Sequence, residues 1–374
     1  MDSVTTALQT AVEDAVFPGA VLAVRVRERL VYLQAVGLTA CPPGGHPVSI
    51  QTIYDLASLT KPLATTSAIL WLVQRGALTL DSPLESVLGE LSDVPLGSAT
   101  LVDLLSHSAG LPAWRPYYER LVPSEEPAAP LLDNPPARQR ALPLIRDEAL
   151  LAPIGAKSVY SDLGFILLGL IVERVSGQPL DRFCADQLFD PLHASPLGFV
   201  PATKLGVAPT PPVQWQAPIA ATEEDPWRGR LLRGEVHDEN AYALGGVAGH
   251  AGLFGTAEAV LALSRAWLRG YLEQSSLFQA GWVRRFTRRA EHVPGSSWAL
   301  GWDTPSPPSS SGRHFSRQAF GHLGFTGTSL WIDPEVELEV VLLSNRVHPS
   351  RRNNAIQRFR PLIHDLVYEE FVRN

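Results

Sequence analysis

The chain contains little cysteine and little charge. Cys41 and Cys184 are the only cysteines among 374 residues, and neither has His or Cys at ligand spacing, which argues against a disulfide framework or a zinc knuckle. Charged residues amount to 18%, and 31 basic against 38 acidic residues give a net charge of −7. Because no block of five like charges occurs, we expect no nucleic-acid partner.

Long apolar runs are also missing. The longest covers residues 163–172, about ten residues against roughly 18 for a membrane span, so it predicts a buried helix and no membrane partner. The first residues include Asp2, Glu13 and Asp14 and lack a basic segment before an apolar run, which argues against a signal peptide. We therefore expect a cytoplasmic protein, which is compatible with the low cysteine content.

Strand-like runs lie near both ends of the chain. They comprise residues 20–26, 30–36, 298–302, 329–332 and 338–344. These short apolar runs are bounded by turn residues, as is typical of strands. The economical arrangement pairs the N-terminal and C-terminal runs in one antiparallel sheet.

Helical patterns occupy most of the remaining chain. They comprise residues 4–16, 61–74, 100–105, 162–175, 180–188, 257–268, 279–288 and 354–372. The Pro-rich segments 122–136 and 200–218 read as loops or insertions. We therefore predict an α+β protein in which residues 1–77 and 246–374 form a sheet flanked by helices. Residues 78–245 would form a mostly helical lobe, with the active-site cleft between the two parts.

Lysine is scarce, and one lysine lies in an informative position. Lys61, Lys157 and Lys204 are the only three, and Lys61 ends the run Ser58-Leu59-Thr60-Lys61. At the start of a helix, residues three apart share a face, so the Ser58 hydroxyl and the Lys61 ammonium can come within hydrogen-bond reach. This pattern indicates an activated serine nucleophile. In the alternative interpretation, Ser58 only caps the helix and Lys61 is solvated.

Two further segments carry polar groups beside turns or strands. Tyr160-Ser161-Asp162 directly precedes the apolar helix, where Asp162 could act as a helix cap. His322 and Gly324 belong to a glycine-rich run just before the strand-like residues 329–332. A glycine-rich strand lets a substrate backbone approach closely.

In this order and spacing, the segments resemble the serine β-lactamase and penicillin-binding-protein superfamily, including its class C-like esterases. The motif S-x-x-K is matched by Ser58 and Lys61, Y-x-N by Tyr160, and H-x-G by His322 and Gly324. The second motif ends here in Asp162 instead of Asn. The resemblance covers nearly the whole chain and implies the β-lactamase/transpeptidase-like fold, with an antiparallel sheet, an all-helical lobe and no cofactor.

The same resemblance implies acyl transfer through a seryl ester. Ser58 would attack a carbonyl, and the backbone N–H groups of Ser58 and Phe325 would stabilise the oxyanion. Tyr160 and Lys61 would share the serine proton, although free Tyr and Lys have pKa values near 10, so one must be tuned. The Asp162 carboxylate would keep Lys61 charged, which favours Tyr160 as the base.

His322 takes the place of the permanent lysine charge found in β-lactam-processing relatives. A histidine is mostly neutral at pH 7, so it provides a weaker, titratable anchor for a substrate carboxylate. This difference favours esterase or amidase chemistry over efficient β-lactam hydrolysis.

A fourth segment, residues 234–254, resembles a subgroup of cell-wall enzymes that includes carboxypeptidases and N-acetylmuramoyl-L-alanine amidases. Its polar residues include His237, Asp238, Glu239, Asn240 and His250. His237, Asp238, Glu239 and His250 could be metal ligands, and the segment could instead be a substrate-contacting loop or a structural hydrogen-bond network. Because adjacent ligands on an irregular strand rarely converge, we expect no metal site and favour substrate contact.

The sequence thus predicts a serine hydrolase that cleaves a small-molecule amide through an acyl-enzyme, with a muropeptide or related cell-wall fragment as substrate. A carboxylesterase of the class C-like family is the nearest alternative. A catalytically silent ligand-binding protein on the same fold is the alternative from a different functional class.

Overall fold

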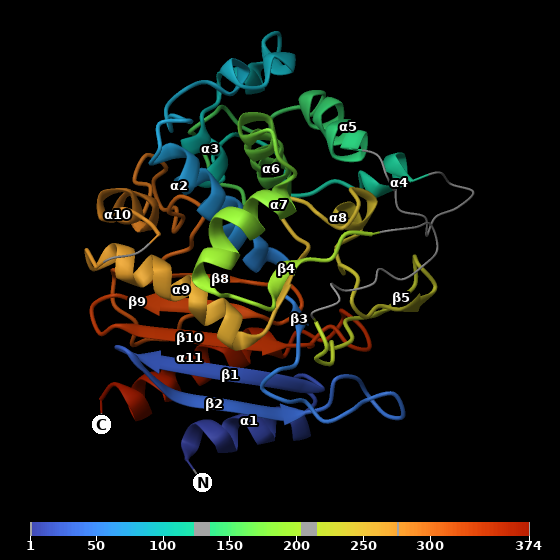
Figure 1. The fold of residues 1–374 in the computed structure, drawn as a ribbon, viewed down its shortest axis with the longest axis vertical. Helices are drawn as coiled ribbons and strands as arrows, with labels where there is room; N and C mark the ends of the chain where they lie inside the picture. Colours follow the sequence, from blue (N-terminus) through green and yellow to red (C-terminus); the bar gives the residue numbers. More distant parts are fainter. Residues whose placement is uncertain (1, 123–134, 203–214, 275–276, 374) are drawn as a thin grey trace.

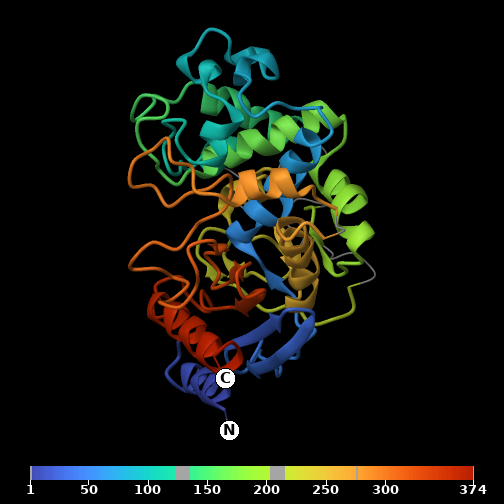
Figure 2. The same ribbon diagram turned by 90° about the vertical axis from the view of Figure 1, so that its left-hand side faces the viewer.

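The main sheet joins the two ends of the chain, as Figures 1 and 2 show. The computed structural model describes residues 2–122, 135–202, 215–274 and 277–373. Five antiparallel strands have the order β2-β1-β10-β9-β8. They are β1 (Gly19–Val26), β2 (Arg29–Gly37), β8 (Phe320–Leu323), β9 (Ser329–Asp333) and β10 (Leu338–Ser344). The predicted pairing of N-terminal and C-terminal strands is therefore confirmed.

Helices cover both faces of this sheet. Successive side chains of a strand point to opposite faces, so Leu22 packs in the cluster formed with α1 (Ser3–Glu13) and α11 (Ile356–Phe371). Its neighbour Val21 packs in the larger cluster that includes α9 (Ala257–Tyr271). Because both faces are covered, β10 is buried along its whole length, and its continuous apolar run covers residues 340–343.

The remaining helical segments form the second half of the molecule, toward the top of Figure 1. The α-helices are α2 (Ser67–Val73), α3 (Leu101–Leu105), α4 (Tyr118–Leu121), α5 (Pro135–Arg146), α6 (Asp162–Ser176), α7 (Leu180–Cys184), α8 (Glu239–Ala243) and α10 (Ala280–Thr287). Short 3₁₀ or π-helical turns are η1 (Ala57–Leu59), η2 (Lys61–Thr66), η3 (Leu84–Ser86), η4 (Gly89–Leu91), η5 (Pro95–Ser98), η6 (Ala185–Phe189) and η7 (Asp190–Leu192).

Residues 78–245 also contribute short strands. β4 (Leu197–Phe199) joins β7 (Leu253–Gly255) and β3 (Tyr54–Asp55) in a three-stranded sheet of order β3-β7-β4. A separate pair is formed by β5 (Glu224–Asp225) and β6 (Arg230–Leu231). Most of the Pro-rich segments 122–136 and 200–218 lie outside the described residues.

The strand predicted over residues 298–302 is wrong. This stretch forms only an isolated bridge between Trp298 and Asp303. The chain turns at Gly301, whose φ is +80°, a left-handed conformation that interrupts an extended strand. Trp302, just after this turn, is buried against Trp267.

The apolar run 163–172 forms the buried core of α6, as predicted. Within the described ranges, no single helix has the length and hydropathy to cross a membrane. One pair, Asp162–Ser176 with Leu180–Leu192, passes that test jointly but is bent by 76°.

Candidate active site

Ser58 is displayed by a sharp turn that leads into a helix. It lies in η1, and the chain continues through η2 into α2. Ala57, just before it, has a φ of +47°, which is uncommon for a residue with a side chain and marks a strained backbone. The Asp55 carboxylate accepts a hydrogen bond from the Ala57 N–H at 2.8 Å and fixes this turn.

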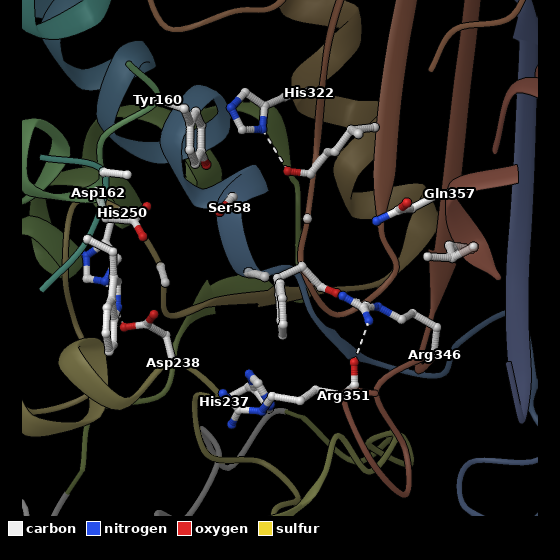
Figure 3. A pocket seen from close by; sticks show the side chains of 18 of the residues that line it. Ser58, Tyr160, Asp162, His237, Asp238, His250, His322, Arg346, Arg351 and Gln357 are labelled. Carbon is white, nitrogen blue, oxygen red and sulfur yellow. Dashed lines mark hydrogen bonds and ion pairs between the residues drawn. The ribbon is translucent and has the colours of Figure 1, made fainter. Parts of the chain in front are cut away.

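Ser58 faces a cavity of about 650 Å³ between the sheet and the helical half of the molecule. Figure 3 shows Ser58 with Asp162, His250 and Asp238 on one side and Arg346 and Gln357 on the other. The cavity brings together nine of the eleven residues predicted for the site. They are Ser58, Tyr160, Asp162, His237, Asp238, His250, His322, Gly324 and Phe325.

Lys61 lies buried directly beneath Ser58. Its Nζ donates to Ser58 Oγ at 3.1 Å and to the His250 carbonyl oxygen at 3.2 Å, and it forms an ion pair with Asp162 Oδ1 at 2.6 Å. Burial alone lowers the pKa of Lys61, but the Asp162 carboxylate and Tyr160 outweigh burial and raise it above its usual value. Two hydrogen-bond acceptors and an adjacent carboxylate are the kind of surroundings that a buried charged lysine requires.

Tyr160 is a phenol in the resting site. Burial raises its pKa, and Asp162 raises it further, whereas Lys61 and hydrogen bonds to Lys61 and Ser58 lower it; the net direction is upward. The Lys61 Nζ lies 4.8 Å from the centre of the Tyr160 ring. The position of Asp162 beside Lys61 agrees with the expectation that Asp162 keeps Lys61 charged. Tyr160, however, is protonated in the resting site and is not a phenolate that could accept the serine proton directly.

Asp162 does not cap α6. Ser161 occupies the cap position, and its hydroxyl accepts a hydrogen bond from the Gly164 N–H at 3.4 Å. Asp162 is the first helical residue, and its carboxylate points to Lys61 instead. The helix N-terminus also favours a negative charge at this position.

His322 is not the titratable anchor that the sequence suggested. Its Nδ1 lies 2.8 Å from the Leu323 carbonyl oxygen, so Nδ1 carries the hydrogen. Burial, together with the positive charge of Lys61, lowers the pKa of His322 to about 3. His322 therefore remains neutral throughout the physiological pH range.

The loop after β8 holds Phe325 close to the turn that carries Ser58. Thr326 Oγ1 donates to the Asp55 carbonyl oxygen at 2.7 Å, and Thr328 Oγ1 donates to that of Leu56 at 3.0 Å. A Cβ at Gly324 would lie 1.9 Å from Thr328 Oγ1, so this close approach requires glycine. Phe325 is 48% exposed and lines the cavity.

The segment around His237 and Asp238 forms another wall of the cavity. Asp55 Oδ2 accepts a hydrogen bond from the His237 N–H at 2.7 Å. Asp238 Oδ1 accepts from the Ala241 N–H at 2.7 Å and lies 2.8 Å from His250 Nε2. Burial raises the pKa of Asp238, but His250 and the Ala241 N–H outweigh burial and bring it below its usual value.

The glycine-rich part of this segment fits between two helices. A Cβ at Gly249 would lie 2.0 Å from the Phe165 carbonyl oxygen of α6. On the other side, Thr65 Oγ1 donates to the Gly249 carbonyl oxygen at 2.7 Å. Gly249 thus places the next residue, His250, where its carbonyl oxygen can accept from Lys61.

Asn240 does not line the cavity, contrary to the prediction. Its side chain is fully buried; Oδ1 accepts from the Tyr118 N–H at 2.9 Å, and Nδ2 donates to the Arg115 carbonyl oxygen at 2.8 Å. Both bonds fasten the segment after Trp114 to α8. Among the described residues, no group of three His, Cys, Asp or Glu side chains could hold a metal ion.

Several residues that line the cavity belong to no motif recognised in the sequence. They are Trp114, Trp298, Arg346, Arg351, Gln357 and Arg360. Trp298 stacks on Tyr160 with ring centres 5.3 Å apart. Arg346 follows β10, and Arg360 lies on α11, so only the fold brings these two arginines to the site.

Comparison with known proteins identifies the family. The family model named Beta-lactamase matches residues 4–362. A Bacillus subtilis (strain 168) protein named "N-acetylmuramyl-L-alanine amidase" is 33% identical over 360 residues, which are 89% of this chain and 78% of that one. An Escherichia coli (strain K12) protein named "Putative D-alanyl-D-alanine carboxypeptidase" is 34% identical over 363 residues, 90% of this chain and 80% of that one.

Solved structures show the same fold at low sequence identity. The hydrolase EstCE1, described as having promiscuous acyltransferase activity, superposes with a TM-score of 0.74 at 22% identity, over 98% of this chain and 97% of that one. An octameric penicillin-binding protein homologue from Pyrococcus abyssi gives a TM-score of 0.71 at 20% identity, over 98% and 76%. With the family match over nearly its whole length, this chain belongs to the beta-lactamase family of serine hydrolases and has the β-lactamase/transpeptidase-like fold.

Proposed function

We propose that this protein is a serine amidase that cleaves a muropeptide or related cell-wall fragment through an acyl-enzyme on Ser58. The observation that carries the proposal is the 3.1 Å contact between Ser58 Oγ and the buried Lys61 Nζ at the wall of the 650 Å³ cavity. A buried charged lysine is costly and is usually retained where it serves chemistry. The amide substrate class is supported by the names of the two relatives at 33% and 34% identity.

In the first step Ser58 Oγ attacks the amide carbon, and the C–N bond breaks to leave a seryl ester and a free amine. The backbone N–H groups of Ser58 and Phe325 stabilise the oxyanion, since the loop after β8 holds both close together. In the second step water attacks the ester and releases the acid, which restores the Ser58 hydroxyl.

The serine proton reaches the leaving nitrogen through a short relay. Lys61 is charged, so it takes the proton of Ser58 only as it passes one of its own to Asp162, 2.6 Å away. Tyr160, hydrogen-bonded to both Ser58 and Lys61, gives its proton to the departing nitrogen and recovers one from Lys61. Asp162 then returns its proton to Lys61, and the site is reset.

The test compares muropeptide amides with unactivated esters of the same acyl group, using the wild-type protein and the Ser58→Ala variant. We expect turnover of the amide that depends on Ser58. An activated ester such as p-nitrophenyl acetate is unsuitable, because a reactive serine hydrolyses it without specificity. If the protein hydrolyses only the unactivated esters and not the amides, it is a carboxylesterase and the amidase proposal is wrong. Binding without any turnover would indicate a catalytically silent protein.

A further inference from the structure

His107 is buried beside Tyr160 and is not among the residues that line the cavity. It follows α3 and is 3% exposed, with its ring centre 4.7 Å from that of Tyr160 and 4.5 Å from that of Trp298. Its φ of +59° lies in the left-handed region, which is strained for a residue with a side chain. The chain thus adopts an unfavourable backbone conformation that places an imidazole against Tyr160.

Two hydrogen bonds to His107 fix the chain on both sides of Tyr160. The His107 carbonyl oxygen accepts from the Val159 N–H at 2.8 Å, and His107 Nδ1 accepts from the Ser161 N–H at 3.0 Å. Val159 and Ser161 are the residues directly before and after Tyr160. Because both neighbours are fastened to one buried residue, the backbone that carries the Tyr160 phenol has little freedom to shift.

The bond from Ser161 requires a neutral imidazole with its hydrogen on Nε2. A backbone N–H only donates, so Nδ1 must hold a lone pair. Burial and the positive charge of Lys61 lower the pKa of His107 well below its usual value, so the imidazole stays neutral. Nε2 itself has no hydrogen-bond partner among the described residues, which is unfavourable for a buried N–H. What the imidazole provides that an apolar ring would lack is therefore the acceptor at Nδ1.

We propose that His107 is a positioning residue for Tyr160 and holds its phenol where proton transfer with Ser58 and Lys61 takes place. The proposal rests on the proton relay proposed above and adds to it a residue outside the cavity. His107 touches none of the reacting atoms and acts only through Tyr160, which is hydrogen-bonded to Ser58 and Lys61. A displacement of such a group by about 1 Å lowers a rate by about a hundredfold.

The test compares His107 variants by the rate at which a fluorophosphonate probe labels Ser58, measured well below the unfolding temperature. Histidine Nδ1 and the asparagine side-chain oxygen are both bonded to Cγ, so His107→Asn keeps an acceptor for the Ser161 N–H and suits the left-handed backbone. His107→Gln places its amide one bond further out and loses that acceptor. We expect His107→Gln to lower the labelling rate about a hundredfold and His107→Asn to stay within about tenfold of the wild type. If His107→Gln does not fold, His107→Ala takes its place.

A double-variant cycle separates positioning from a general loss of structure. Because His107 acts through Tyr160, His107→Gln should lower the labelling rate less than about threefold when it is made in the Tyr160→Phe protein. His364→Gln is the matched control: His364 is also fully buried but lies on α11 and does not line the cavity, so the labelling rate should stay at the wild-type value.

Equal labelling rates in His107→Asn and His107→Gln would overturn the proposal. So would a loss in His107→Gln that has the same size with and without the Tyr160 hydroxyl, since His107 would then act independently of Tyr160. The probe is not an amide, so the expected pattern of rates in a protein that turns over no amide would refute the amidase and leave the role of His107 standing.

Discussion

The Lys61 ammonium and the Asp162 carboxylate lie 2.6 Å apart at the base of the cavity. Lys61 is fully buried, whereas the Asp162 side chain is 17% exposed on the cavity side. The pair keeps an ammonium beneath the nucleophile that burial alone would discharge. The second family motif, Y-x-N, has Asn at the position of Asp162. The ion pair between Lys61 and Asp162 therefore distinguishes this site from sites that follow the motif.

Removing the charge of Asp162 should alter the pH dependence of turnover. Asp162→Asn keeps the size of the side chain but removes the negative charge that raises the pKa of Lys61. An amide cannot accept the proton that Lys61 passes to Asp162, so kcat should fall. The coupled Lys61 and Tyr160 pair should also lose a proton more easily, which moves the basic limb of the kcat profile to lower pH by about one unit. A profile that superimposes on that of the wild type would show that Asp162 has no part in proton transfer.

The ion pair between Lys61 and Asp162 should also contribute to the free energy of unfolding. Lys61→Met leaves Asp162 without its cation and should lower the free energy of unfolding by about 3–5 kcal/mol. The double variant Lys61→Met/Asp162→Asn removes both charges and should recover part of that loss. Urea unfolding of the four proteins in this cycle gives the coupling energy. Strictly additive losses would mean that the ion pair is not formed in solution.

Ser58, Lys61 and Tyr160 should behave as one unit in turnover. Ser58→Ala should lower kcat by at least about a thousandfold, with Lys61→Ala and Tyr160→Phe nearly as damaging. The double variant Lys61→Ala/Tyr160→Phe should be little worse than either single variant, because both residues serve the same proton transfer. Losses that multiply would show that Lys61 and Tyr160 act independently.

His322 should not change its protonation state between pH 5.5 and 8. Its pKa of about 3 lies well below this range, so it stays neutral and cannot read substrate charge by titration. The ratio of KM for a carboxylate and a carboxamide substrate should therefore show no transition near pH 6.5. A transition that disappears in His322→Gln would contradict the buried neutral histidine.

Buried histidines should make the fold sensitive to acid. Burial lowers the pKa of His322 to about 3 and that of His364 to about 4, whereas an unfolded histidine titrates near 6.5. Between these values the unfolded chain binds more protons, so stability is complete above about pH 6.5 and is lost as the pH falls. The expected slope is about 1.4 kcal/mol per pH unit for each histidine.

His364→Gln tests that slope away from the cavity. Urea unfolding at pH 7, 6 and 5 should show a shallower loss of stability in this variant than in the wild type. His46→Gln, at an exposed histidine, is the control and should follow the wild-type slope. Parallel curves for all three proteins would refute this role of His364.

Much of the fold follows from local sequence patterns. The apolar run that became α6 and the β-rich runs that became β1 and β2 are bounded by charged or turn residues, so periodicity identifies them. The run from Trp298 to Trp302 has a similar composition but turns at Gly301, because Trp302 packs against Trp267. Such tertiary packing leaves no trace in a short window of sequence.

Some residues of the site could also be predicted from local sequence, whereas others are brought there only by the fold. Ser58 and Lys61 are neighbours on one helical turn, so spacing alone predicts their contact. Arg360 and Arg346 reach the cavity from α11 and from the end of β10, which no local pattern records. Asn240 was predicted to lie at the site because it belongs to the same segment as His237 and Asp238, but residues along a helix point in different directions.

A covalent intermediate at Ser58 is the central requirement of the proposed mechanism, and intact-mass spectrometry can detect it. The wild-type protein is treated with a fluorophosphonate probe and, separately, with a muropeptide amide quenched in acid, and Ser58→Ala serves as the control. We expect one adduct per chain in the wild type, mapped by digestion to the peptide that contains Ser58, and none in the variant. An adduct on another residue, or amide turnover that persists in Ser58→Ala, would contradict the account.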